Sequence, residues 1–182
     1  MRKFLQSILT KPVAAMAKRY SSKPNLQRVH EALSKLYAHT LEHPGKKGLL
    51  LPMNAETDRF IIFSDQHKGA KNGSDDFMWA EPNYVAALAH YYNEGYHFIS
   101  LGDSEELWEN TVWPVKSKNK ITTEAEKKFL TEKRFTKVFG NHDLFWNNDP
   151  FAGLQLFSMY GETVKIYEAV VLQTSISNTA LD

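Results

Sequence analysis

Short apolar runs alternate with longer amphipathic stretches along the middle of this chain. Three runs are predicted to be strands because they are short, apolar and followed at once by polar residues: 60–63, 98–101 and 135–139. Between them, residues 83–94 and 123–133 place apolar side chains at helical spacing. This strand–helix–strand–helix–strand order predicts an α/β fold with a parallel sheet.

The pattern continues on both sides of this central region. Residues 25–43 repeat apolar side chains at helical spacing, and Pro44-Gly45 is expected to end that helix. After the third strand we expect a short helix over 151–160 and strands near 163–166 and 168–173.

Charge is distributed unevenly along the chain. The first 30 residues contain seven Lys or Arg side chains and no carboxylate. Such a start is typical of a basic leading helix, and it is also found in transit peptides and membrane-surface helices. We expect the leading helix, with Phe4, Leu5, Ile8 and Leu9 on one face. The predicted division is a basic helical extension over 1–55 and a second domain over 56–182.

The remaining composition is that of an ordinary globular protein. The formal net charge is +1, which indicates no clear nucleic-acid or membrane partner. The sequence contains no Cys, so disulfides and thiolate metal ligands are excluded, and a cytoplasmic location is expected. The oligomeric state stays open.

A polar motif directly follows each of the three central strands. These motifs are Asp65-Gln66-His67, Gly102-Asp103-Ser104-Glu105-Glu106 and Gly140-Asn141-His142-Asp143. Ligands of parallel sheets collect at the carboxyl ends of the strands, so we expect the motifs to form one site. Their carboxylate, imidazole and amide groups suit divalent metals.

Two motifs offer metal ligands by their spacing. Asp65 and His67 would point the same way in an extended segment and so share one cation. Asp103 has two carboxylate oxygens and can bridge two cations. The alternatives are a turn in which Asp65 caps backbone amides and a helix N-cap at Asp103.

The third motif combines a ligand with an imidazole. Asn141 offers an amide oxygen to a second cation, and His142 would face a substrate. Asp143 is expected to accept a hydrogen bond from one ring nitrogen and fix the tautomer. The alternative is a surface turn without chemistry.

Two lysines and several aromatic residues lie near the motifs. Lys68 and Lys71, in a glycine-rich loop, are candidates for binding a substrate phosphate, and a solvated loop is the alternative. Core packing is the expected role of the aromatic side chains, and stacking on a substrate is the other: Trp108, Trp113, Phe145 and Trp146.

As an ordered set, the three motifs resemble those of the calcineurin-like metallophosphoesterase family. The resemblance covers residues 60–146. It implies a β-sandwich flanked by helices, with the site at the strand ends, and a reaction that hydrolyses a phosphomonoester or phosphodiester. The class of phosphoester is not indicated.

The resemblance also implies a role for each motif residue. Asp65 and His67 would bind a first divalent ion, Asp103 would bridge both ions, and Asn141 would bind the second. The ions would be Mn, Fe, Zn, Ni or Co, and a hydroxide between them would attack phosphorus. His142, positioned by Asp143, would stabilise or protonate the leaving oxygen.

The chain departs from the family after its third motif. Family members carry a lone His and then Gly-His-x-His downstream, but this chain has no His beyond His142. We therefore expect a sandwich that is incomplete at the C-terminus, as in an N-terminal fragment of a longer enzyme. The alternatives are a natural short form that acts as a scaffold or interaction module, and a nucleic-acid or membrane binder that uses the basic first 30 residues.

Overall fold

The computed structural model describes residues 2–21 and 23–174 and divides the chain into two units, Met1–Lys35 and Leu36–Asp182. The first unit contains α1 (Arg2–Tyr20) and the start of α2 (Leu26–Glu42). None of the helices among the described residues is both long and apolar enough to cross a membrane.

The second unit contains two parallel sheets. The smaller one pairs β1 (Gly48–Met53) with β6 (Ala169–Thr174), register Gly48 to Ala169. This pairing places β1 in the second unit, whereas the sequence division at residue 55 assigned it to the extension. The larger sheet has the order β2-β3-β4-β5, with all neighbours parallel. Its strands are β2 (Phe60–Phe63), β3 (His97–Leu101), β4 (Phe135–Val138) and β5 (Ile166–Tyr167).

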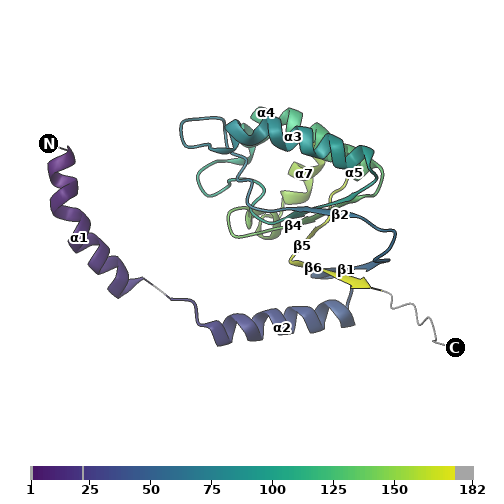
Figure 1. Ribbon diagram of the computed structural model, residues 1–182, viewed down its shortest axis with the longest axis horizontal. Helices are drawn as coiled ribbons and strands as arrows, with labels where there is room; N and C mark the ends of the chain where they lie inside the picture. The colour runs from purple at the N-terminus through teal and green to yellow at the C-terminus, as the bar shows by residue number, and fades with distance from the viewer. Residues whose placement is uncertain (1, 22, 175–182) are drawn as a thin grey trace. The chain divides into compact units, whose positions relative to one another are not determined.

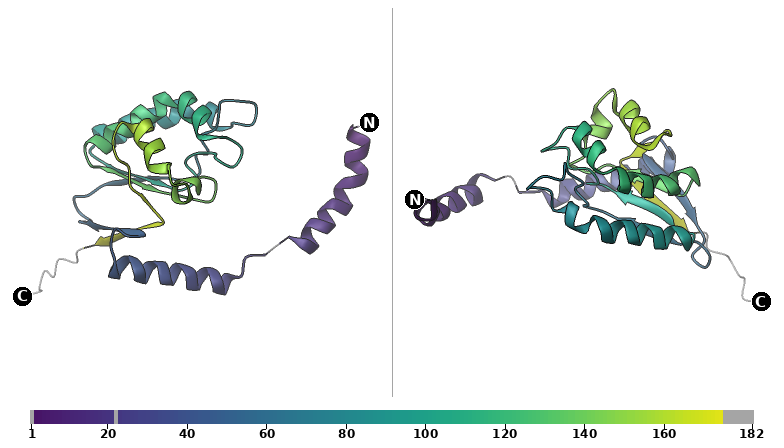
Figure 2. Two further views of the ribbon diagram at one scale, coloured as in Figure 1. Left: turned by 180° about the vertical axis from the view of Figure 1, so that it is seen from behind. Right: turned by 90° about the horizontal axis from the view of Figure 1, so that it is seen from above.

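Helices connect the strands of the larger sheet, as the alternating pattern predicted. They are α3 (Phe77–Asn93), α4 (Val112–Lys118), α5 (Lys120–Thr131), α6 (Phe145–Asn148) and α7 (Ala152–Tyr160). Figures 1 and 2 show α3 and α5 over one face of this sheet and the β1–β6 pair on its other side. The α/β class and the parallel sheet are therefore confirmed.

The helix α3 begins six residues earlier than the predicted 83–94. The Asp75 side chain accepts a hydrogen bond from the Met78 N–H at 3.2 Å, which satisfies a donor of the first turn. Phe77, the first residue of the helix, is buried in the core, so the added segment combines this hydrogen bond with a core contact.

The core lies between the larger sheet and its helices. Phe98 and Ile99 are adjacent in β3 and both fully buried, as expected for a strand covered on both faces. Ile62 in β2 is 45% exposed, so this edge strand is not covered on both faces although its sequence is fully apolar. Two clusters fill the helix side, with Phe77, Tyr84, Leu88, Phe98 and Phe129 in one and Trp146, Ala152, Leu156, Tyr160 and Val164 in the other.

Candidate functional site

Backbone hydrogen bonds join the loops that follow β2, β3 and β4. The Asp65 N–H donates to the Gly102 carbonyl at 3.2 Å, and the Gly102 N–H donates to the Val138 carbonyl at 3.0 Å. One step further, the His67 N–H donates to the Asp103 carbonyl at 2.9 Å. The parallel ladder thus continues beyond the strands and holds the polar motifs side by side.

Asp65, His67 and Asp103 have left-handed backbone conformations, as do Lys71 and Gly102 in the same loops. The φ angles are 59° at Asp65, 48° at His67 and 48° at Asp103. Such angles are uncommon for residues other than Gly and cluster at functional sites. The expected extended geometry of Asp65 and His67 is therefore wrong: the side chains converge because the backbone turns twice.

The turned backbone brings three potential metal ligands together. One ligand atom from each of Asp65, His67 and Asp103 lies within 4.8 Å of the other two. His67 Nε2 lies 3.9 Å from Asp65 Oδ1. Two carboxylates and one imidazole at this spacing suit a single divalent cation.

Glu106 lies between the two imidazoles of the site. Its Oε2 atom is 2.9 Å from Nδ1 of His67 and 2.7 Å from Nδ1 of His142. Its side chain is 14% exposed. Burial raises the pKa of Glu106, but the hydrogen bonds with His67 and His142 outweigh burial and lower it below the ordinary value. These three residues form a second group with metal-ligand spacing.

Asp143 has a different role from the one that the sequence suggested. The fully buried carboxylate accepts hydrogen bonds from the Ser104 N–H at 2.9 Å and the Gly140 N–H at 2.6 Å. It therefore fastens the third loop to the second through the backbone. The ring nitrogen Nδ1 of His142 contacts Glu106 instead.

His142 is held from three sides. Its backbone N–H donates to Asp103 Oδ1 at 2.7 Å, its ring contacts Glu106, and the indole of Trp108 stacks on the ring with centroids 4.0 Å apart. Trp108 is 65% exposed, so it forms an outer wall of the site rather than core. Asn141 is exposed beside this cluster.

Lys68 is removed from the surface by an internal ion-pair network. Its ammonium lies 3.0 Å from Glu105 and 2.6 Å from Glu126, and the residue is 2% exposed. Glu105 also binds Lys137 at 2.9 Å and accepts from Trp146 Nε1 at 2.8 Å. The prediction that Lys68 binds a substrate phosphate is therefore wrong, because two buried carboxylates already neutralise it.

Ion pairing within the network keeps Lys68 and Glu105 charged despite their burial. Burial alone lowers the pKa of Lys68, but Glu105 and Glu126 outweigh burial and raise it. Burial likewise raises the pKa of Glu105, and Lys137 and Lys68 together lower it well below the usual range. Glu105 directly precedes Glu106 in the chain, so the buried ion-pair network also holds the second motif in position.

Lys71 is also paired within the protein. Its ammonium forms an ion pair with Glu81, and its backbone N–H donates to Asp75 Oδ2 at 2.7 Å. A cavity of about 280 Å³ adjoins the metal-ligand group, and the ionisable side chains in its wall are carboxylates and His67. Its carboxylates are those of Asp65, Asp75, Asp76, Glu106 and Glu109.

Comparison with protein-family models, curated proteins and solved structures finds no match for this chain. The interpretation of the site therefore rests on its geometry and on the motif resemblance.

The structure brings Asp65, His67, Asp103 and His142 together and adds one residue that the sequence argument passed over. This residue is Glu106, the last position of the second motif, for which the sequence predicted no role at the site. A second carboxylate three residues after a candidate ligand was the available signal.

Proposed function

We propose that this chain is a calcineurin-like metallophosphoesterase that hydrolyses a phosphomonoester or phosphodiester, with an incomplete form of that family's sandwich fold. The observation that carries the proposal is the convergence of Asp65, His67 and Asp103 from two loops, next to His142 from a third. A surface turn without chemistry does not need left-handed backbone at three acidic or imidazole residues.

The donor set fits one divalent ion well. Asp65, His67 and Asp103 supply three protein ligands with atoms in mutual reach, and solvent can supply the rest. In the arrangement that the resemblance implies, a second ion would rely on Asp103 and Asn141 among the described residues. Two protein ligands form a weak site, so the first ion is the better supported of the two.

The surrounding residues suit phosphoester hydrolysis. A bound cation would polarise the phosphoryl group and lower the pKa of a water molecule. Glu106 holds Nδ1 of His142 and thereby presents Nε2 for proton transfer to the leaving oxygen. Trp108 limits the rotation of that ring by stacking on it.

A catalytically incomplete scaffold is the second candidate. It is favoured by the small donor set for a second ion and by the absence of an unpaired lysine in the wall of the adjoining cavity, as far as the described residues show. Such a protein would bind one metal ion without hydrolysing a phosphoester.

Metal titration coupled to a hydrolysis assay separates these candidates. Calorimetry with Mn²⁺ and with Zn²⁺ should detect binding, and Asp103→Asn should weaken it at least tenfold. Asp58→Asn, which changes an exposed carboxylate away from the site, should bind metal normally. Hydrolysis of bis-p-nitrophenyl phosphate by the metal-loaded chain supports the enzyme, metal binding alone supports the scaffold, and the loss of both rejects the metal-centre proposal.

A further inference from the structure

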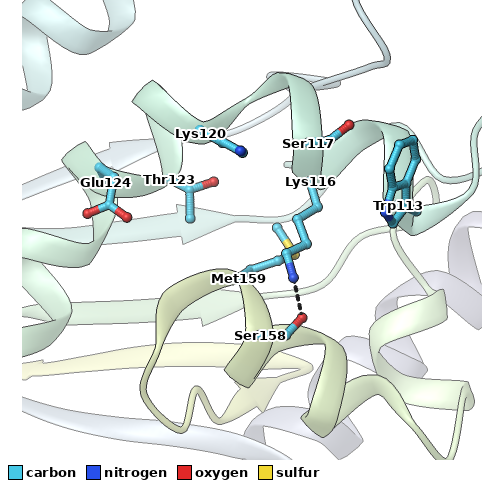
Figure 3. Close-up of a pocket in the computed structure, with 8 residues that line it drawn as sticks. All are labelled: Trp113, Lys116, Ser117, Lys120, Thr123, Glu124, Ser158 and Met159. Atoms are coloured by element: carbon cyan, nitrogen blue, oxygen red, sulfur yellow. Dashed lines mark hydrogen bonds between the residues drawn. The ribbon is translucent and has the colours of Figure 1, made fainter.

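A second cavity lies between α4, α5 and α7, apart from the residues of the candidate metal centre (Figure 3). Its volume is about 470 Å³, within the range of small-molecule sites. The lining residues are Trp113, Lys116, Ser117, Lys120, Thr123, Glu124, Ser158 and Met159.

The hydrogen-bond donors available in this cavity are mainly ammonium groups. The hydroxyl of Ser117 donates to the Pro114 carbonyl at 3.1 Å, and that of Thr123 donates to the Asn119 carbonyl at 3.0 Å. The Ser158 hydroxyl likewise donates to a backbone carbonyl. These hydroxyl protons are committed to the backbone, which leaves the lysines to recognise a ligand.

Two lysines face the cavity without a carboxylate partner in the described part of the chain. Lys116 Nζ donates to Ser158 Oγ at 2.7 Å and has further protons to offer. Lys120 has no ion pair with Glu124, the single carboxylate of the lining. Figure 3 shows both ammonium groups on the cavity side of the helices. This contrasts with Lys68 and Lys71, which are both neutralised by glutamates.

One wall of the cavity is apolar and is formed by an aromatic side chain and a thioether. Trp113 stands at one end in Figure 3 and is 76% exposed, while Met159 contributes a partly buried thioether. A flat ring stacked on this exposed indole would bury its apolar face. Aromatic pairs favour such stacked or edge contacts. A plain inorganic anion would use the lysines and leave this wall uncovered.

We infer that this cavity binds a small ligand in which an anionic group is joined to an aromatic ring, such as a nucleoside or aryl monophosphate. The anion lies between Lys116 and Lys120, and the ring covers Trp113. The site is separate from the proposed metal centre, so this inference does not depend on the phosphoesterase proposal.

The test uses adenosine monophosphate as the probe, with the full chain kept metal-free by a chelator. Two-dimensional NMR follows the indole N–H resonances, and Trp113→Phe identifies the resonance of Trp113. Adenosine monophosphate should shift that resonance and bind at least tenfold more tightly than either inorganic phosphate or adenosine. Equal affinity for inorganic phosphate would overturn the aromatic part of the inference.

Matched variants locate the binding. Lys116→Gln and Lys120→Gln should each weaken binding by at least fivefold, whereas Lys118→Gln, on the same α4 helix but outside the cavity, should leave it unchanged. Trp113→Ala should also weaken binding by at least fivefold. The inference is overturned if Lys118→Gln weakens binding as much as the cavity variants, or if binding is lost in His142→Asn and retained in Lys120→Gln.

Discussion

One carboxylate oxygen of Glu106 lies 2.7 Å from Nδ1 of His142. The same oxygen is 2.9 Å from Nδ1 of His67, so a single group orients both the imidazole expected to bind metal and the one expected to act on the leaving oxygen. Partners of this kind fix the tautomer and the ring angle of histidines in metal sites.

Replacing Glu106 should therefore impair chemistry more than folding. Glu106→Gln keeps the shape of the side chain but removes its charge, and kcat of the metal-loaded protein should fall about 10- to 100-fold, as is usual for residues that orient metal-site histidines. The measurement is the rate of bis-p-nitrophenyl phosphate hydrolysis, with Glu56→Gln at an exposed site as the matched control.

The pH profile adds a readout that a purely structural role would not change. Because Glu106 holds Nδ1 of His142, its loss should alter the pH dependence of kcat along with its size. A Glu106→Gln variant with unchanged kcat and an unchanged profile would remove Glu106 from the site.

Lys68 is expected to govern stability rather than substrate binding. Lys68→Met leaves Glu105 and Glu126 buried with one cation fewer, and the free energy of unfolding should fall by about 3–5 kcal/mol. Urea denaturation measures the change, and Lys46→Met at an exposed position should have little effect.

A second substitution tests whether charge balance is the cause. Adding Glu126→Gln to Lys68→Met restores equal numbers of positive and negative groups among the two lysines and two glutamates of the network. The double variant should be at least about 1 kcal/mol more stable than the sum of the single changes predicts. Strict additivity would argue against an electrostatic cause.

The sequence predicted the central strands well because each is a short, largely apolar run followed by a polar motif, although the third includes Thr136 and Lys137. The same reasoning missed β1, since nothing in residues 48–53 indicates that their partner is β6, more than a hundred positions later. It also placed Lys68 at the surface. A lysine that follows a metal motif is equally compatible with a substrate contact and with a buried ion pair, and only Glu105 and Glu126, brought there by the fold, decide between them.

The local backbone geometry of the site could not be predicted from the sequence for a similar reason. The conformations of Asp65 and His67 depend on hydrogen bonds to the loop around Gly102 and Asp103, so their left-handed backbone is a tertiary effect. The choice of Glu106 over Asp143 as partner of His142 has the same origin. Both carboxylates lie in the quoted motifs, and their contacts follow from how the loops pack.

His97 should make stability depend on pH in a defined window. Burial, with a smaller effect of Arg134, lowers the pKa of His97 from 6.5 to about 4. The unfolded chain therefore binds a proton as the pH falls below 6.5 while the folded chain does not, so the stability decreases from about pH 6.5 down to about pH 4. Solvent screening at this partly exposed ring limits the effect to about 1–2 kcal/mol.

Removing His97 isolates this contribution from that of the carboxylates. The difference in unfolding free energy between pH 7.5 and pH 4.5 should be smaller in His97→Gln than in the unmodified chain, and His90→Gln at an exposed position serves as the control. Equal differences in all three proteins would contradict the assignment.

Gly140 is expected to be irreplaceable for steric reasons that act on the site directly. A Cβ atom at this position would lie 2.3 Å from Asp103 Oδ1 and 2.6 Å from the Asp103 backbone nitrogen. Asp103 would have to move, and its hydrogen bond with the His142 N–H would be lost. Gly140→Ala should therefore weaken Mn²⁺ binding at least tenfold and lower the unfolding free energy by about 1–3 kcal/mol.

Gly153 in α7 provides the matched comparison, because a Cβ there would meet no atom within 4 Å. Gly153→Ala should leave metal affinity unchanged and raise stability by up to about 1 kcal/mol, as is usual for alanine in a helix. Calorimetric titration and urea denaturation of both variants separate a local displacement of Asp103 from a general loss of folding. If Gly140→Ala bound Mn²⁺ as tightly as Gly153→Ala, Asp103 would not be a ligand at its observed position.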